Sequence, residues 1–388
     1  MPTSGSTITP PTISMATRNA PGISVEAITD YQSFLDLESV WRDLAAAVGV
    51  DHPFLSYEWV RTWWESFGHG KELHVLVVKD RSDPIAIAPL MLSHGRMYGL
   101  NVRRLESIGN AHTQRFDFII GRSPKDAYRA IWAHLLEQRP RWDVLQLCQL
   151  VEGSPTLDEL RALATAQGFP SGVWRSDSSP YLSLLGTWEI YAKGLDAKHR
   201  SNLRNRLKRL RRLGQVGVET ISSVDGMGGA LDDGLRLEAA AWKGEAGTAI
   251  GSRPELRYLY TRFAERAAAR GWLRLHFLNV GGCRIAFHYA VRCNNKLYLL
   301  KPGYDPRYAR YSPSNLLCHL VLQDGFHDGL AEYNFLGGEE PWKLEWTKDT
   351  RPHHWLFIFS DGLRGRLLHY AKFHVVPRVK RMVSRNGR

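Results

Sequence analysis

Residues 297–346 contain the stretch that decides the fold, LYLLKPGYDPRYARYSPSNLLCHLVLQDGFHDGLAEYNFLGGEEPWKLEW. Its apolar start predicts a β-strand, and a loop rich in Tyr and Arg follows. Pro313 suits the first turn of a helix, after which come a second strand and the pair Gly337-Gly338. A strand that turns into a helix leaves main-chain N–H groups pointing outward at the positive end of the helix dipole. This order of parts predicts a site for a phosphorylated ligand in the loop 310–315.

The length and charge of the chain limit the number of domains and the kinds of partner that we expect. Its 388 residues exceed the usual ~100–200 residues per domain, which predicts two domains. The formal net charge of +12 favours an anionic partner: a phosphate, a nucleic acid or an anionic membrane surface. No apolar run approaches the ~20 residues that span a bilayer, which predicts a soluble or peripheral protein. The four cysteines form no Cys-x-x-Cys pair, so we expect a reducing cytoplasm and neither zinc nor a disulfide framework.

Hydrophobic periodicity predicts a duplicated α/β unit. In the first half it predicts helices at 31–48 and from Ser56 to near Gly68, then a hairpin of strands 73–79 and 85–92. In the second half it predicts a helix at 258–269 and strands at 273–280 and 285–291. At an offset of 200 residues, Ile85-Ala86 falls on Ile285-Ala286 and Glu65 falls on Glu265. Both copies then have the order helix, strand, turn, strand.

Two basic segments each have more than one interpretation. Residues 198–214 combine a stripe of leucines with many Lys and Arg, and Gly214 is the expected C-cap. Such a helix either covers the domain junction, contacts the phosphates of a substrate, or binds nucleic acid. The run from Arg378 to Arg388 is either a solvated tail or a contact for a membrane surface. Residues 1–22, rich in Ser, Thr, Pro and Gly, are expected to be a disordered tail.

Several motifs in a fixed order resemble a known superfamily. They are the basic helix 198–214, Trp242-Lys243-Gly244 after Glu238, the Tyr304-Asp305 turn, Ser312-Pro313, and Asn334-Phe335-Leu336-Gly337-Gly338 followed by Lys343. Together they resemble the GNAT acyltransferases, specifically the CelD-like acetyltransferases of bacterial polysaccharide synthesis, which are similar to the FemAB peptide-bond-forming enzymes. The run FLSYEWVRTWWESFG at 54–68 matches the first half of such proteins.

The resemblance implies an α/β, or α+β, fold of two tandem GNAT-like domains, each with a mixed central sheet flanked by helices. The expected domains are residues 23–186 and 187–360, and residues 361–388 are expected to form a basic helix or tail. Acyl-CoA would enter a wedge between central strands of the second domain. The residues implied to bind it are Lys301, Arg310, Tyr311, Ser312, Ser314 and Asn315. Two positions depart from the family pattern, since Ser314 replaces the usual Gly and Asn334 the usual Asp.

Acyl transfer to an amine needs a base for the ammonium, donors for the oxyanion and often an acid for the leaving thiolate. The candidate bases are Glu238, His288, Asp305, Glu332 and Glu339, and the candidate acids are Tyr304, Tyr308 and Tyr311. Candidate substrate contacts are Tyr57, Trp59, Trp242, Lys243, Asn334, Glu339 and Lys343. For each of these residues the alternative is a structural role: a paired carboxylate, a packed aromatic ring or a surface lysine.

The resulting hypothesis is a cytoplasmic N-acyltransferase, or O-acyltransferase, that uses acetyl-CoA or another acyl-CoA as cosubstrate and needs no metal. Its acceptor would be an amino sugar or similar precursor of a surface polysaccharide, free or lipid-linked, and the enzyme could sit at the inner membrane face. One alternative is a FemAB-like transferase that takes an aminoacyl group from tRNA to a cell-wall precursor. Another is a GNAT-fold binding module without catalysis. The sequence has no Gly-x-Ser-x-Gly, Walker or His-Glu-x-x-His motif.

Overall fold

The computed structural model describes residues 21–138, 141–240, 250–379 and 382. The first half alternates helices and strands largely as its periodicity predicts. Its elements are β1 (Ile23–Ile28), α1 (Tyr31–Asp36), α2 (Glu38–Ala47), η1 (Pro53–Leu55), α3 (Tyr57–Phe67), β2 (Glu72–Asp80), β3 (Asp83–Met97), β4 (Leu100–Ser107), β5 (Ile119–Ile120), α4 (Pro124–Glu137), β6 (Val144–Val151), α5 (Pro155–Ala166) and β7 (Ser171–Ser183). The Ser56 side chain accepts a hydrogen bond from the Trp59 amide and so caps α3, as predicted.

The second half repeats this order of elements, and its last strand then joins the sheet of the first half. Its elements are α6 (Trp188–Gly194), α7 (Ala197–Leu210), β8 (Val216–Ile221), α8 (Met227–Ala239), η2 (Ile250–Ser252), α10 (Pro254–Ala269), β9 (Leu273–Val280), β10 (Cys283–Cys293), β11 (Lys296–Tyr304), η3 (Pro306–Tyr311), α11 (Pro313–His327), β12 (Glu332–Asn334), α12 (Pro341–Leu344), β13 (Thr350–Phe359), α13 (Leu363–Tyr370) and the π-helix η4 (Ala371–Val375). The helix predicted to begin near Pro313 is confirmed as α11.

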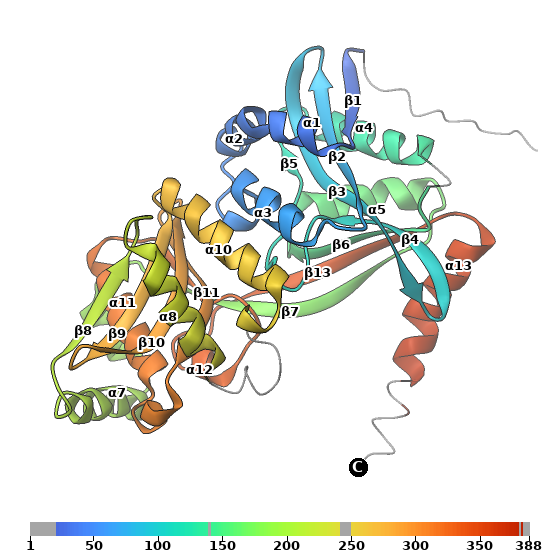
Figure 1. The fold of residues 1–388 in the computed structure, drawn as a ribbon. Helices are drawn as coiled ribbons and strands as arrows, with labels where there is room; N and C mark the ends of the chain where they lie inside the picture. The colour runs from blue at the N-terminus through green and yellow to red at the C-terminus, as the bar shows by residue number, and fades with distance from the viewer. Residues whose placement is uncertain (1–20, 139–140, 241–249, 380–381, 383–388) are drawn as a thin grey trace, which may run out of the picture.

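One mixed β-sheet runs through both halves (Figure 1). In the described ranges it has 13 strands, with β5 beside β3 and the rest in the order β1-β2-β3-β4-β6-β13-β7-β12-β11-β10-β9-β8. Helices α4 and α5 pack on one face of the first half, while α1 to α3 pack on the other. In the second half α7 and α11 cover one face, and α8 and α10 cover the other. This mixed α/β architecture confirms the predicted fold class.

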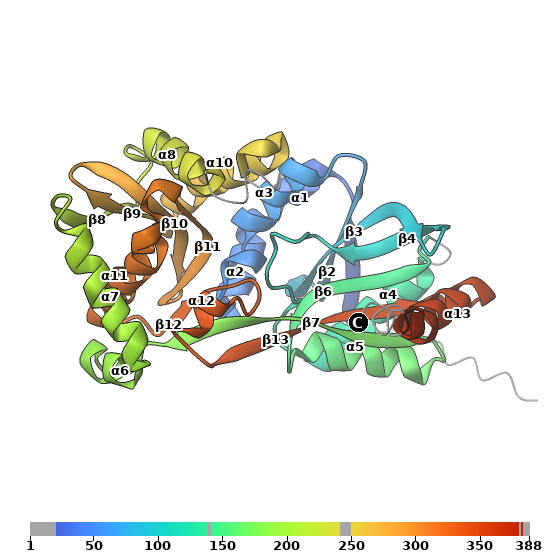
Figure 2. The same ribbon diagram turned by 90° about the horizontal axis from the view of Figure 1, so that it is seen from below.

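Strands β7 and β13 connect the halves. Figure 2 shows them running side by side across the molecule, and β13 pairs with both β6 and β7. The far end of β7 pairs with β12 of the second half. Residues 350–359 therefore complete the sheet of the first half, although they follow the second half in sequence. The expected domain boundary at residues 186 and 187 stays a prediction.

The predicted offset of 200 residues is confirmed by the register of the two hairpins. Val78 pairs with Ala86 in the first half, and Leu278 pairs with Ala286 in the second. Each hairpin also has a bulge at the same place, next to Ile85 in one copy and Ile285 in the other. A shared irregularity is stronger support for duplication than shared regular pairing, because regular strands pair in this way in many folds.

The two halves differ in the segment that pairs with the second strand of each hairpin. In the second half β11 continues along β10 with a single bulge near Leu300. In the first half the equivalent strand stops at Ser107 and pairs again with β3 only at Ile119. Residues 108–118, here called the crossing loop, fill this gap, and Ile119–Ile120 then form the short strand β5. Because the loop leaves the sheet, its side chains can reach the second half.

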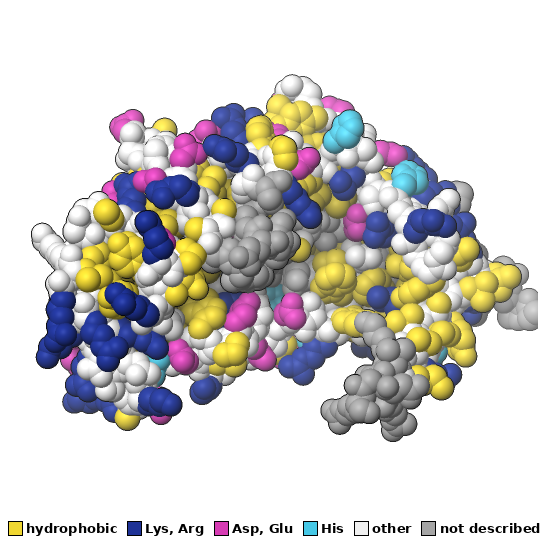
Figure 3. All heavy atoms as spheres, turned by 60° about the horizontal axis from the view of Figure 1, so that its bottom comes forward, with side chains coloured by type: hydrophobic (Ala, Val, Ile, Leu, Met, Phe, Trp, Pro, Cys, Tyr) yellow, Lys and Arg dark blue, Asp and Glu magenta, His cyan; other side chains and the backbone are white. Residues whose placement is uncertain are grey.

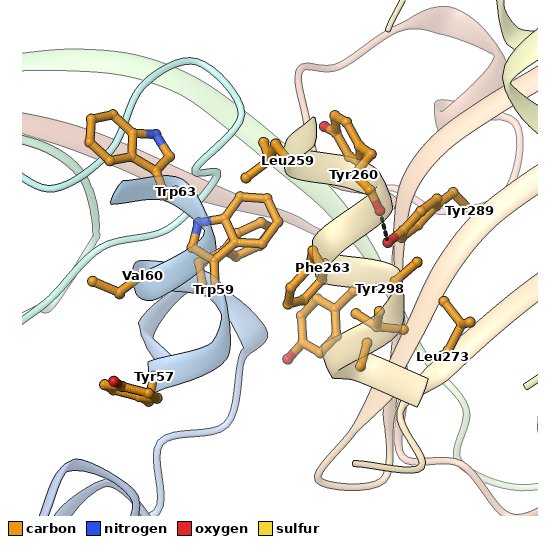
Figure 4. Close-up of a cluster of buried hydrophobic side chains, with 14 of the residues drawn as sticks. Tyr57, Trp59, Val60, Trp63, Leu259, Tyr260, Phe263, Leu273, Tyr289 and Tyr298 are labelled. Atoms are coloured by element: carbon orange, nitrogen blue, oxygen red, sulfur yellow. Dashed lines mark hydrogen bonds between the residues drawn. The ribbon is translucent and has the colours of Figure 1, made fainter. Parts of the chain in front are cut away.

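Helices α3 and α10 pack together between the halves (Figure 4). The Trp59 ring makes edge contacts with Phe54 and Phe263, at centroid distances of 4.9 and 4.8 Å. Beside them Arg266 binds the Glu65 carboxylate at 2.8 Å. Burial alone would raise the pKa of Glu65, but hydrogen bonds from Arg266, Tyr31 and Arg61 lower it to about 2. The carboxylate is therefore charged at neutral pH and links the halves.

The basic helix is shorter than predicted. Helix α7 ends at Leu210 with Arg211 as its C-cap, so the prediction that Gly214 caps it is wrong. Gly214 lies instead against the β9–β10 turn, where an added Cβ would come within 2.9 Å of the Gly281 Cα atom. The chain needs glycine here for close backbone contact and not for ending a helix. The tail predicted at 1–22 lies, up to residue 20, outside the described residues.

Candidate active site

A cavity of about 570 Å³ opens where β11 and β12 part. These parallel strands pair only from Lys296–Glu332 to Tyr298–Asn334, after which β11 continues along β10 without β12 beside it. The end of β11, the start of α11, the turn after β12 and helix α12 surround the space. The lining residues are Gln114, Glu238, Leu299, Leu300, Lys301, Pro302, Gly303, Tyr304, Ala309, Ser312, Pro313, Ser314, Asn315, Phe335, Leu336, Gly337, Glu340, Trp342 and Lys343.

The N-terminus of α11 forms one wall of the cavity. Ser312 adopts the left-handed conformation, with φ of 50° and ψ of 59°, and turns the chain sharply into Pro313 at the first helical position. No side chain caps the helix. The amides of Ser314 and Asn315 belong to its first turn, where an α-helix offers no acceptor of its own. The helix dipole adds partial positive charge, so this wall suits a phosphate.

The structure separates the six residues expected to bind the cofactor. Lys301, Ser312, Ser314 and Asn315 line the cavity. Arg310 and Tyr311 are not among the lining residues, and the Arg310 guanidinium lies 4.8 Å from the centroid of the Tyr311 ring. Behind the wall, His288 Nε2 lies 3.2 Å from the Ser314 hydroxyl. Burial, reinforced by His276, lowers the pKa of His288 to about 3, so its ring is neutral and supports Ser314.

Glu238 is the candidate base that the fold brings to the cavity. It lies at the end of α8, is 1% exposed, and its Oε2 accepts a hydrogen bond of 2.9 Å from the Ile250 amide. Glycine at position 303 allows α8 to pack this closely against β11, because an added Cβ would come within 2.6 Å of the Glu238 Cα atom. Close approach of α8 to β11 thus places the carboxylate beside the end of the strand that lines the cavity.

The other carboxylates proposed as bases have partners or lie elsewhere. Asp305 caps η3 and binds Arg307 through both oxygens, and this hydrogen bonding lowers its pKa. Burial favours a raised pKa for Glu332, but hydrogen bonds from Arg351 and Asn334 outweigh it and lower the pKa. Glu339 is exposed and is not among the lining residues.

Asn334 and Lys343 shape the turn after β12. Asn334 donates to Glu332 at 2.9 Å and accepts from the Leu336 amide at 3.1 Å. Lys343 donates to the carbonyl oxygens of Leu336 and Gly338, at 2.6 and 3.2 Å, and pairs with Glu340. Both side chains therefore fix the backbone of the cavity wall, and substrate contact by either stays a prediction.

Tyr57 and Trp59 do not reach this cavity. Trp59 is buried between the halves, where its Nε1 donates to Thr113 Oγ1 at 3.1 Å, whereas Tyr57 is buried against Phe34 and Trp41 of the first half. Burial raises the pKa of Tyr57 to about 12. The structure thus supports the packing alternative for these aromatic residues, because their amphipathic helix faces α10. Trp242 and Lys243 lie outside the described residues.

Gln114 is a lining residue that the sequence did not indicate. It belongs to the crossing loop, and its Oε1 accepts a hydrogen bond of 3.2 Å from the Gly337 amide. His112 in the same loop lies 3.0 Å from the Tyr260 hydroxyl. Glu340 and Trp342 were also missed, although they directly precede Lys343 in the conspicuous stretch EEPWK, which could have indicated them.

A second cavity of about 440 Å³ adjoins the first and shares Gln114 and Gly337 with it. Its lining is rich in polar side chains from the first half, among them Glu106, Asn110 and Asp177. The two cavities meet at the contact between the crossing loop and the turn after β12. A ligand in each could therefore approach the other at this point.

Comparison with known proteins agrees with this geometry. Residues 197–344 match the family model described as an acetyltransferase (GNAT) domain. FemX has a TM-score of 0.58 and 11% identity, over 84% of this chain and 98% of that one. The C-terminal domain of a proposed lysylphosphatidylglycerol synthetase from Agrobacterium fabrum has a TM-score of 0.53 and 13% identity, over 88% of this chain and 96% of that one. A protein of unknown function from Bacteroides thetaiotaomicron has a TM-score of 0.53 and 13% identity, over 86% of this chain and 100% of that one. No curated protein matches.

These comparisons define a class of fold. The second half has a GNAT-type domain in the stretch that holds the cavity, and the chain as a whole shares the fold of FemX. The internal repeat makes the arrangement a tandem one. Among the described residues no cluster of His, Cys, Asp and Glu is placed to hold a metal, and no helix is both long and apolar enough to cross a bilayer.

Proposed function

We propose that the protein is an acyl-CoA-dependent N-acyltransferase. The observation that carries this proposal is the uncapped start of α11, which opens onto the end of β11 beyond its pairing with β12. Amides at a helix start can hold a pyrophosphate, and the main chain along the edge of a strand can pair with an amide-bearing arm. The four lining residues Lys301, Ser312, Ser314 and Asn315 would hold the cosubstrate, with acetyl-CoA as the simplest candidate.

The chain supplies groups for the proton transfers. Glu238 would accept a proton from the ammonium of the acceptor, so that the free amine can attack the thioester carbonyl. The thioester provides the acyl group and a thiolate that leaves when the C–S bond breaks. Tyr304 lines the same cavity and would donate a proton to that thiolate. Main-chain N–H groups near the bulge of β11 are candidates for stabilising the developing oxyanion.

The acceptor would occupy the adjoining polar cavity. Its carboxylate, amide and hydroxyl lining suits a molecule with many hydroxyl groups, such as an amino sugar. We propose a precursor of a surface polysaccharide, free or lipid-linked, whose amine reaches the junction at Gln114 and Gly337. This acceptor would meet the acyl group beside Glu238.

Replacing Ser314 with Asp tests the cosubstrate site. A carboxylate in the first turn of a helix stabilises the helix by about 0.3–1 kcal/mol, so folding should not suffer. The same charge should repel a pyrophosphate and raise the Kd for acetyl-CoA about 10- to 100-fold, as measured by calorimetry. Ser314→Gly is the matched control and should bind at least as well as the native chain. Equal affinity of Ser314→Asp and native protein would place the pyrophosphate elsewhere.

A FemAB-like aminoacyl transferase is the second candidate, and the observation that favours it is the exposed face of α7. Figure 3 shows Lys and Arg side chains gathered at one end of the molecule. On and just after α7, exposed basic residues are Lys198, Arg204, Lys208, Arg209, Arg211 and Arg212. Steeply salt-dependent binding of aminoacyl-tRNA, lost when these residues are neutralised, would favour this function over acyl-CoA chemistry.

We also propose that the protein contacts an anionic membrane surface through α13 and the turns that follow. Exposed apolar side chains occur at Leu363, Leu367 and Tyr370, and again at Val375, Val379 and Met382. The π-helix, which begins directly after the first set and ends at Val375, adds one residue to a turn and would thereby bring both sets to one face. The opposite face holds the helix to the sheet through Leu368. Exposed Arg364, Arg366 and Arg378 flank the apolar stripe, as in helices that lie in a membrane interface.

Replacing Leu363 and Leu367 with Asp should abolish binding to vesicles that contain phosphatidylglycerol, as measured by co-sedimentation. The two changes remove exposed apolar surface and add negative charge, while the buried contacts of α13 remain. Val224→Asp, an equally exposed site on another surface, should bind like the native protein. If the native protein does not sediment with these vesicles, the stripe is no membrane contact, and concentration-dependent dimerisation would then identify a second copy as its partner.

A further inference from the structure

A third cavity, of about 410 Å³, lies in the first half, on the other side of the crossing loop from the active site. Helices α4 and α5 begin at its wall with Pro124 and Pro155. Residues 48–52 after α2, residues 115–118 of the crossing loop and Arg351 of β13 also line it. The proposed acyl transfer uses none of these residues.

This cavity corresponds to the active-site cavity under the internal repeat. Ser123 before α4 has φ of 55° and ψ of 52°, and Ser312 before α11 has 50° and 59°. A proline follows each serine at the first helical position, and neither helix has a side-chain cap. The first half therefore keeps the backbone of a phosphate-binding turn, although the crossing loop has replaced the strand that would lie beside it.

Arg115 is the unusual residue of this cavity. Its side chain is 3% exposed, and its Nε and Nη2 atoms have no hydrogen-bond partner among the described residues. The Glu332 carboxylate lies 3.9 Å from Nη2, beyond hydrogen-bond distance. That carboxylate already accepts hydrogen bonds of 2.9 Å from Arg351 and from Asn334. A buried guanidinium with free donors is costly unless an anion meets it.

The neighbouring charged groups supply that anion only in part, because Glu332 forms no more than a long ion pair of 3.9 Å with Arg115. Arg351 forms a shorter ion pair with Glu332, and Lys296 forms an ion pair with Asp51. The remaining carboxyl group, Asp117, accepts hydrogen bonds from the Thr156 hydroxyl and from the Phe118 amide at 2.8 Å. Burial raises the pKa of Asp117, which weakens it further as a partner for Arg115. Burial and the charge of Arg115 lower the pKa of His52 to about 3, so this ring adds no positive charge.

We propose that this cavity binds a small oxyanion, a carboxylate or a phosphate, through the guanidinium of Arg115. The anion would bind where the Arg115 guanidinium and the uncapped start of α4 both line the cavity. Gln114, next in the chain, contacts the turn that walls the active site, so occupancy would also hold the crossing loop in place. The inference concerns a separate site and does not depend on the chemistry proposed for the first cavity.

Thermal unfolding of the full chain in inorganic phosphate, in acetate and in sodium chloride of equal ionic strength tests the proposal. We expect a saturable rise in Tm of about 2–4 °C with one of the two oxyanions and not with chloride. A rise with phosphate alone would identify a phosphate site, and a rise with acetate alone a carboxylate site. The rise should persist in Ser314→Asp, whose active-site cavity repels phosphate.

Two further variants assign the effect to Arg115. Arg115→Lys keeps the positive charge and so protects folding, but it lacks the forked donors and should lose most of the rise. Arg129→Gln, an exposed change on α4, should keep it. The proposal is overturned if neither oxyanion raises Tm above chloride. A full rise in Arg115→Lys, or loss of the rise in Ser314→Asp, would also overturn it.

Discussion

Replacing Glu238 with Gln is expected to lower kcat/KM by about 10²- to 10⁴-fold, the usual contribution of a general base. Gln keeps the size of the side chain and can still meet the Ile250 amide, so α8 should stay packed on β11. It cannot accept the proton of the ammonium. The affinity for acetyl-CoA should therefore be unchanged, and the loss should appear in steady-state kinetics with an amine acceptor.

The control for this experiment is Glu255→Gln, which changes an exposed carboxylate in the first turn of α10 and should leave kcat/KM unaltered. Full activity in Glu238→Gln would show that Glu238 is not the base, and Glu340, which also lines the cavity, would be the next candidate. An absence of transferase activity in the native chain, with intact acetyl-CoA binding, would instead favour a binding module without catalysis.

Trp59→Ala is expected to lower the free energy of unfolding by about 3–5 kcal/mol. The ring is fully buried between Phe54 and Phe263, and its removal also leaves the Thr113 hydroxyl without its donor. Trp59 itself lines neither cavity, but Thr113 lines the proposed acceptor cavity, so the affinity for acetyl-CoA rather than the KM for the acceptor should stay unchanged in the protein that remains folded. Urea unfolding followed by circular dichroism would measure the loss.

Tyr258→Ala provides the comparison for this measurement. It changes a partly exposed aromatic residue on α10, the helix that Trp59 packs against, and should cost only about 0.5 kcal/mol. If Trp59→Ala raised KM for the acceptor and left stability unaltered, the ring would be a substrate contact, as the sequence first indicated.

The sequence predicts the regular parts of this fold because local patterns determine them. The apolar spacing in 57–67 and the capping Ser56 define α3, and Ser312-Pro313 defines the start of α11. Even the 200-residue repeat can be read from Ile85-Ala86 and Ile285-Ala286, since the same bulge preserves both pairs. The wall of the cavity that binds phosphate in our proposal follows from the same short-range pattern.

The selection of catalytic residues depends on contacts between distant segments. Glu332 looks as available in sequence as Glu238, but Arg351 and Arg115 approach it only in the folded chain. Gln114 lies in a loop without periodicity, and its contact with Gly337 joins residues of opposite halves. Asp305 is the exception, since Arg307 two positions later is a local signal that this carboxylate is paired.

The position of β13 has a consequence for synthesis of the protein. Strands β6 and β7 cannot acquire their shared neighbour until residue 359 has left the ribosome. At typical rates of about 5–20 residues per second, the interval after β7 emerges lasts roughly 10–35 s. Until β12 and β13 have emerged, β6 has one unpaired edge and β7 has two, and such edges invite pairing with other chains. We expect a nascent chain stalled before residue 350 to be held by chaperones and to aggregate on release.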